Sequence, residues 1–154
     1  MITIGALKYL ASQKRKDAET LFRLNRNNGA VYLMGYALEL SFKRKVCQTL
    51  GFNSGFPESG TELHLYSGQL ARFNAISSSI SLTQLRQIKN HNLDQLLIYS
   101  GAQTRILNSY LNEWLLVKNW NPETRYKILR FSNVKAANFM GGIQAYSQRN
   151  CLNS

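Results

Sequence analysis

Apolar side chains recur at three- and four-residue steps over most of the chain, a spacing that places them on one face of a helix. In the first predicted helix, over about 4–26, these positions are Ile4, Leu7, Leu10, Ala11, Ala18, Leu21 and Phe22. We expect it to end in the asparagine-rich run that closes with Gly29, because glycine adopts positive φ without a steric cost. A second helix is predicted over about 30–49, with an apolar or small face made by Ala30, Leu33, Met34, Ala37, Leu38 and Ser41.

The same spacing returns in the second half of the chain. It predicts a helix that opens at 90–94 and stops near Ser100, and another over 103–118. Asn121 followed by Pro122 is typical of a helix N-terminus and predicts a short helix. Ser132 can cap a final helix over 133–149. No segment alternates as a half-buried strand would, so we predict an all-α, up-down bundle of five to six helices.

Residues 51–89 lack this periodicity and contain most of the chain's turn-forming residues. Four glycines, Pro57 and the serine run at 77–79 interrupt the stretch, although a short helix over about 61–74 fits Leu63, Leu70 and Phe73. The stretch is too long for a plain connection within a compact domain. We therefore predict one domain over 1–154, with a loop-rich or short-helix insertion at 51–89.

Composition supports a globular protein. The chain has 154 residues, of which 44% are apolar and 18% charged, enough for one ordinary domain with a core. Its two cysteines and two histidines are too few for common zinc-finger patterns, and Cys47 and Cys151 suit a reducing cytosol. The first residues do not resemble a secretory signal, and no run of about 18 apolar residues predicts a membrane span. We therefore expect a cytoplasmic protein without a membrane partner.

The formal net charge is +11, and it is concentrated in two parts of the chain. Residues 1–50 have a balance of +6, residues 51–100 of zero, and residues 101–154 of +5. If 8–26 and 125–149 pack together, they form one basic face that includes Lys14, Arg15 and Lys16 and attracts RNA or DNA. The alternative is that the surplus charge only improves solubility.

Sequence motifs for familiar catalytic sites are missing. There is no glycine-rich phosphate loop followed by lysine, no GxSxG, no HExxH and no CxxC. Acidic residues are few and scattered, so neither a metal nor another cofactor is expected. The remaining catalytic type to consider is metal-independent cleavage of a phosphodiester, in which arginine and histidine do the chemistry.

Three stretches resemble HEPN domains, the higher-eukaryote and prokaryote nucleotide-binding helical family. They are 28–43 (NGAVYLMGYALELSFK), 91–97 (HNLDQLL) and 120–126 (WNPETRY), in the family's order. The resemblance implies a helical bundle that pairs into a homodimer. Some members are metal-independent ribonucleases with an Arg and a His four to six residues apart, and others are binding or regulatory partners. The second kind often occurs beside a nucleotidyltransferase or as part of a toxin–antitoxin pair, in mobile or defence loci.

The Arg-x4-His spacing occurs here at Arg86 and His91. As an endoribonuclease, the protein would use His91 to move a proton of the ribose hydroxyl or leaving oxygen, and Arg86 to hold the phosphate. The alternative is that His91 only forms a hydrogen bond at the start of its helix. Because of that alternative, a non-catalytic module that binds nucleic acid, a nucleotide or a partner protein is our main hypothesis.

Two further pairs are candidates for either structure or binding. Glu39 and Lys43 have the i, i+4 spacing of a helix-surface ion pair, worth a few tenths of a kcal/mol, and Lys43 is also a candidate ligand contact in a dimer cleft. Arg125 can grip a phosphate and Tyr126 can stack on a base. Alternatively, Tyr126 packs in the bundle and Arg125 ties a helix end to a carboxylate. We also expect glycines on 30–49 and 133–147, among them Gly35, Gly141 and Gly142, to allow close helix contacts in a homodimer.

Overall fold

The computed structural model describes residues 1–70, 91–126 and 130–148, and all regular secondary structure in these ranges is helical. The helices are α1 (Ile4–Arg23), α2 (Asn27–Leu50), α3 (Gly60–His64), α6 (Leu93–Tyr99), α7 (Gln103–Ser109), α8 (Leu111–Val117), the 3₁₀-helix η2 (Pro122–Tyr126) and α9 (Asn133–Gln148). The predicted all-α class is confirmed. The described ranges contain more helices than the five or six expected, because several of them are only five to seven residues long.

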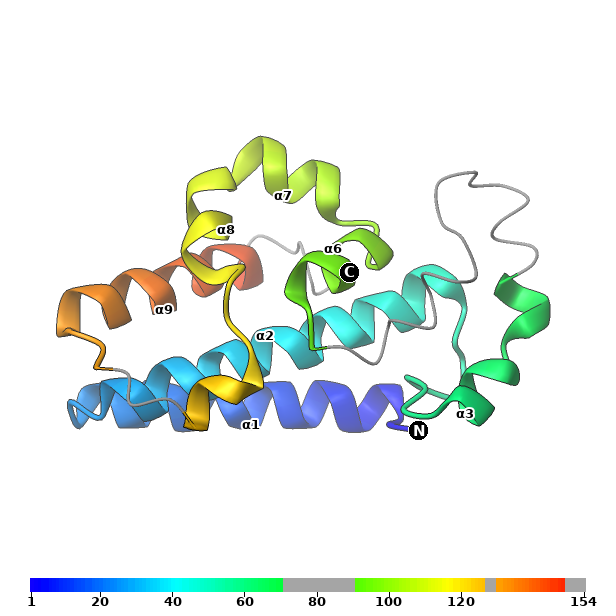
Figure 1. The fold of residues 1–154 in the computed structure, drawn as a ribbon, viewed down its shortest axis with the longest axis horizontal. Helices are drawn as coiled ribbons and strands as arrows, with labels where there is room; N and C mark the ends of the chain where they lie inside the picture. Colours follow the sequence, from blue (N-terminus) through cyan, green and yellow to red (C-terminus); the bar gives the residue numbers. More distant parts are fainter. Residues whose placement is uncertain (71–90, 127–129, 149–154) are drawn as a thin grey trace.

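Helices α1 and α2 form a long antiparallel hairpin along one edge of the molecule (Figure 1). The side chain of Thr3 caps α1 by accepting from the N–H of Ala6 (3.2 Å). The turn that ends α1 is made by Asn25, which has a φ of 56°, a conformation that asparagine tolerates better than most residues. The expected end of the helix near the asparagine-rich run is therefore confirmed, but the turn expected at Gly29 is wrong, since Gly29 lies inside α2.

Helix α2 is the central element of the fold. It lies between α1 on one side and α6 and α9 on the other (Figure 1), and it is covered around most of its circumference. Its buried residues are Ala30, Val31, Met34, Gly35, Ala37, Leu38, Glu39, Leu40, Phe42, Lys43, Val46, Cys47 and Leu50. A helix that is apolar all round is typical of such a position. The single apolar face predicted for this helix is therefore too narrow.

The later helices begin close to the predicted positions. Asn92 caps α6, its side-chain oxygen accepting from the N–H of Gln95 (3.2 Å). Ser132 caps α9 by accepting from the N–H of Lys135 (3.3 Å). The helix predicted over 103–118 is divided into α7 and α8 at Tyr110, whose φ of −143° is not helical. The division lets α8 turn and pack against α9 (Figure 1).

The first part of the predicted insertion is packed against the N-terminal end of α1. Gly51, with a φ of 71°, ends α2, and an isolated bridge then pairs Phe56 with Ile2. The rings of Phe52 and Tyr66 stack at 4.2 Å, and both side chains are buried. Helix α3 at Gly60–His64 and the helical residues 67–70 correspond to the short helix expected near 61–74, with a turn at 65–66 between them, and residues 71–90 lie outside the described ranges.

None of the helices in the described ranges combines the length and apolar character needed to cross a bilayer.

Candidate functional site

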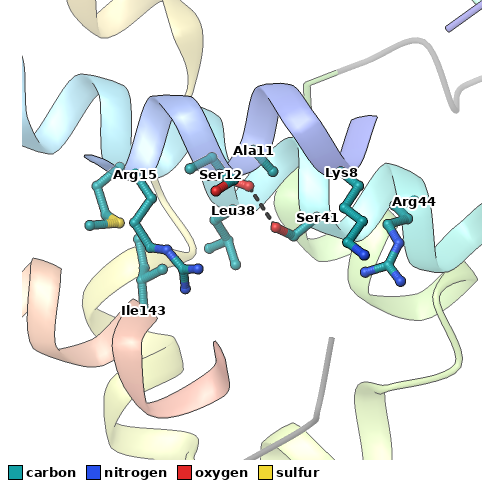
Figure 2. Close-up of a pocket in the computed structure, with 10 residues that line it drawn as sticks. Lys8, Ala11, Ser12, Arg15, Leu38, Ser41, Arg44 and Ile143 are labelled. Carbon is teal, nitrogen blue, oxygen red and sulfur yellow. Dashed lines mark hydrogen bonds between the residues drawn. The ribbon is translucent and has the colours of Figure 1, made fainter. Parts of the chain in front are cut away.

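A cavity of about 160 Å³ lies between α1 and α2, and one side chain of α9 reaches it. Its lining residues are Lys8, Ala11, Ser12, Arg15, Met34, Ala37, Leu38, Ser41, Arg44 and Ile143. Figure 2 shows Lys8 and Arg44 together at one end and Arg15 at the other, with Leu38 between them and Ile143 beside Arg15. The cavity therefore combines cationic ends with an apolar interior.

The polar groups of this cavity suit a negatively charged ligand. Three lining residues are cationic, and none of the described lining residues is acidic. The hydroxyl of Ser41 donates to the carbonyl of Ala37 (2.8 Å), the dashed line in Figure 2. Ser12 has no such hydrogen bond within the described part of the chain, so its hydroxyl is available as a donor.

A second polar cluster is formed by the predicted pair of Glu39 and Lys43, together with His91. Lys43 Nζ donates to Glu39 Oε1 (2.6 Å), which confirms the ion pair, and His91 Nδ1 lies 2.8 Å from the same oxygen. The expected surface location is wrong, since the side chain of Glu39 is fully buried and that of Lys43 is 9% exposed. Lys43 also lies over the ring of Phe56, 5.2 Å from its centroid. Its charge is therefore held inside the bundle, where nucleic acid does not reach it.

His91 connects this buried cluster with the surface. Half of its side chain is exposed, at a cleft of about 530 Å³ lined by residues 91–94 and 118–123. The expected hydrogen bond between His91 and its own helix start is wrong, because Asn92 caps α6 and His91 bonds to Glu39. Since a carboxylate only accepts hydrogen bonds, Nδ1 carries a proton and Nε2 is the nitrogen left for a ligand.

Trp120 forms the inner wall of this cleft and depends on a glycine of α2. A Cβ atom added at Gly35 would come within 2.3 Å of the Trp120 indole. The indole is 6% exposed, and its Nε1 has no hydrogen-bond partner in the described ranges. Gly35 therefore serves a contact inside the chain, as does Gly142, which lies against the backbone of Glu113 in α8.

The structure separates the other predicted site residues. Lys14 and Lys16 flank Arg15 on α1, but only Arg15 lines the cavity. Tyr126 is 74% exposed, so the alternative in which it packs inside the bundle is wrong. The backbone of Arg125 belongs to η2, whereas its side chain and all of Arg86 lie outside the description.

Sequence reasoning missed Lys8, Ser12 and Arg44. Their spacing from the predicted turn could have identified them, because an antiparallel hairpin brings together residues about equally distant from its turn. Lys8 and Ser12 precede the Asn25 turn by about as many residues as Ser41 and Arg44 follow it. The cleft residue Lys118 had no comparable signal, since a loop brings it to α6 from far along the chain.

Burial also determines the chemistry of the cysteine in the described ranges. Cys47 is 1% exposed, and burial raises the pKa of its thiol to about 12. The thiolate, which is the reactive form, is therefore scarce near neutral pH. No group of three or more potential ligands among His, Cys, Asp and Glu is close enough to hold a metal ion in the described ranges.

Comparisons with protein-family models, with curated proteins and with solved structures found no match for this chain.

Proposed function

We propose that this protein is a non-catalytic, basic helical module that binds nucleic acid through its phosphate groups. The observation that carries the proposal is that Lys8, Arg15 and Arg44 all line one cavity, and that none of its described lining residues is acidic. Arginine and lysine donate charge-assisted hydrogen bonds to phosphate oxygens, and arginine can donate two in parallel. The HEPN resemblance independently favours a nucleotide-binding helical protein.

The basic residues outside the cavity extend this surface along α1. Lys14 is half-buried and Lys16 is exposed, directly beside Arg15. Contacts with phosphate position a protein on nucleic acid without reading its bases. We therefore expect little sequence preference and a steep dependence on salt. Neutralising about five phosphates of duplex DNA corresponds to a log–log salt slope near −4.5, and single strands give a shallower one.

Charge reversal on α1 tests the proposal. Binding of labelled RNA and DNA is measured by fluorescence anisotropy over a salt series for wild type, Arg15→Glu and the triple variant Lys14→Glu/Arg15→Glu/Lys16→Glu. Arg105→Glu is the matched control, because Arg105 is exposed on α7 at the opposite edge of the molecule from α1 (Figure 1).

We expect Arg15→Glu to weaken binding of all sequences alike and the triple variant to weaken it further, whereas Arg105→Glu has a small effect. Equal losses for Arg15→Glu and Arg105→Glu would show that only net charge matters. If wild type binds no nucleic acid at about 50 mM salt, where phosphate contacts are strong, the proposal is wrong and a partner protein is the better hypothesis.

The proposal includes a homodimer, for which α8 provides the better surface. Gly35 and Gly142 are occupied by contacts within the chain. Leu111, Leu115 and Leu116 of α8 are each about half exposed. Sedimentation at tens of micromolar tests the dimer, and Leu115→Glu is expected to weaken it. A monomeric wild type would contradict this part of the proposal.

The contact between Glu39 and His91 favours a second candidate function, metal-independent endoribonuclease activity. A buried carboxylate holds Nδ1 of a half-exposed histidine, and the ring lies at the rim of a 530 Å³ cleft. A carboxylate in this position orients the imidazole for proton transfer through Nε2. Arg86 would be the residue that holds the phosphate.

RNA cleavage in EDTA tests this candidate. Wild type is compared with His91→Ala and with His64→Ala, which removes an exposed histidine of α3 as the control. Cleavage that is lost only in His91→Ala would establish the enzyme. Wild type without cleavage, or cleavage equal in both variants, would exclude His91 as its catalytic residue.

A further inference from the structure

We propose that the cavity between α1 and α2 holds one nucleobase of a single-stranded nucleic acid, with the phosphates on either side of that nucleoside at the two cationic ends of the cavity. This inference rests on the proposed function and names the class of nucleic acid that the site selects. It depends on the separation of the two cationic ends, on the side chains between them and on the volume that they enclose.

The two ends of the cavity are separated by the spacing of Lys8 and Arg15 on α1. These residues are seven positions apart, which is about two turns and about 10 Å of helix, so both lie on the same face. Neither forms an ion pair with a described residue. Arg44 lies beside Lys8 but is engaged within the chain, so Lys8 is the cation available at that end. Because the two cations lie at opposite ends (Figure 2), they suit two phosphates of one strand better than a single phosphate.

The space between the two ends is lined by small and apolar side chains. Ala11 and Ser12 lie between the two cations on α1, and Leu38 of α2 lies between the same ends (Figure 2). A phosphate group gains nothing from an apolar surface, whereas a nucleobase gains when its faces are removed from water. The hydroxyl of Ser12 can both donate and accept a hydrogen bond, so it can meet the polar edge of any base.

The volume of the cavity fits a base better than a whole nucleoside. It is about 160 Å³, below the roughly 300–1,000 Å³ of pockets that enclose most of a small organic ligand. One enclosed water needs about 10–15 Å³, so the cavity has room for a group of about ten non-hydrogen atoms, which is the size of one nucleobase. The sugar and its two phosphates would stay outside, within reach of the two cations.

A duplex cannot place a base in this cavity without losing a base pair. Its bases are stacked and paired in the interior, and successive nucleotides rise only about 3.4 Å along each strand. The bases of a single strand can be turned outward and buried against a protein. Duplex DNA or RNA would therefore contact the cations through phosphate alone, whereas a single strand would gain the additional contact of its base.

An abasic strand tests the inference, because it keeps the phosphates and lacks the bases. Fluorescence anisotropy measures the binding of a labelled oligothymidylate, of an abasic strand with the same length and charge, and of the oligothymidylate paired with its complement. Wild type is compared with Ser12→Leu, which fills the cavity without changing the charge. Thr104→Leu is the matched control, because it adds the same side chain at an exposed position of α7. Thermal unfolding checks that each variant is folded.

We expect wild type to bind the oligothymidylate about five- to tenfold more tightly than the abasic strand, as the burial of a base would give. Ser12→Leu should bind the two strands alike and keep the duplex affinity of wild type, whereas Thr104→Leu should keep the preference for the intact strand. The comparison of the two strands on wild type decides the inference even if Ser12→Leu does not fold.

The outcomes separate this inference from the proposed function. If wild type binds the abasic strand as tightly as the oligothymidylate, the base site is refuted and binding through phosphate stands. A preference for the intact strand that folded Ser12→Leu retains would place the base elsewhere and would also refute the inference. If wild type binds none of these nucleic acids at about 50 mM salt, where phosphate contacts are strong, both proposals are wrong.

Discussion

The ion pair between Glu39 and Lys43 provides a quantitative test of how burial changes a common sequence pattern. On an exposed helix, this pair at i and i+4 would contribute about 0.3–0.5 kcal/mol. Here the Glu39 side chain is fully buried and the Lys43 side chain is 9% exposed. Removing one partner of a buried pair leaves the other charge without compensation and typically costs about 3–5 kcal/mol.

Substitution by methionine removes the charge and keeps much of the length of each side chain. We expect Glu39→Met to destabilise the protein by about 3 kcal/mol, at the lower end of that range, because the ring of Phe56 still faces the ammonium group of Lys43. Lys43→Met should cost less, because His91 still contacts the carboxylate. The double variant should come within about 1 kcal/mol of wild type or exceed its stability, since it leaves no unpaired charge.

Urea unfolding of the four proteins gives the coupling free energy of the pair. Glu19 and Arg23 on α1 are the matched control, because they have the same order and spacing, while Arg23 is exposed. Their coupling should not exceed about 0.5 kcal/mol. A loss below about 1 kcal/mol in Glu39→Met, or equal coupling in the two pairs, would refute the argument that burial determines the strength of this interaction.

Three further predictions follow from single positions. Gly35→Ala should cost a net 1–3 kcal/mol or so in urea unfolding, since its Cβ would lie 2.3 Å from the indole beside it, whereas Gly141→Ala, with open space, should gain about 0.5–1 kcal/mol. In a Cys151→Ser background, Cys47 should react with a thiol reagent only as fast as the protein unfolds, because burial raises the pKa of the thiol to about 12. Fast labelling of the folded protein would contradict this prediction. The pKa of Glu62 is lowered by hydrogen bonds from the N-terminal ammonium group and the N–H of residue 58, so its contribution is present above its unfolded pKa near 4.5 and is lost as pH falls below it. Wild type should therefore lose stability relative to Glu62→Gln as the pH is lowered through about 4. If the free energies of unfolding of the two proteins change with pH in parallel, the role given to the Glu62 carboxylate is wrong.

The positions of the helices could be predicted from the sequence because helix formation depends on local signals. Periodic apolar residues located α1, α2 and α9 to within a few residues at most ends, and the capping role of Ser132 was visible without any tertiary contact. Two predicted details were wrong, the turn residue after α1 and the continuity of the helix over 103–118, because apolar periodicity does not specify which residue forms a turn or a break. Asn25 took the left-handed turn expected at Gly29, and Tyr110 interrupted a continuous apolar face.

Which polar groups would be buried was decided by tertiary structure alone. The spacing of Glu39 and Lys43 is the same whether α2 lies on the surface or at the centre, and only the packing of α1, α6 and α9 around α2 places the pair in the interior. His91 joins it because α6 begins beside α2, far from it in sequence. Periodicity reports which side of a helix is apolar and cannot report how many neighbours cover it.

The candidate sites also depend partly on the sequence and partly on the tertiary structure. The amino-acid sequence by itself determined that the chain is strongly basic and helical, since charge and helical periodicity are properties of the residues and their spacing. The tertiary structure decided which charges act together, because an electrostatic site needs groups within a few ångströms of one another. Arg15 was predicted within a basic run with Lys14 and Lys16, but the antiparallel hairpin places Lys8 and Arg44 together at one end of the α1–α2 cavity and Arg15 at the other.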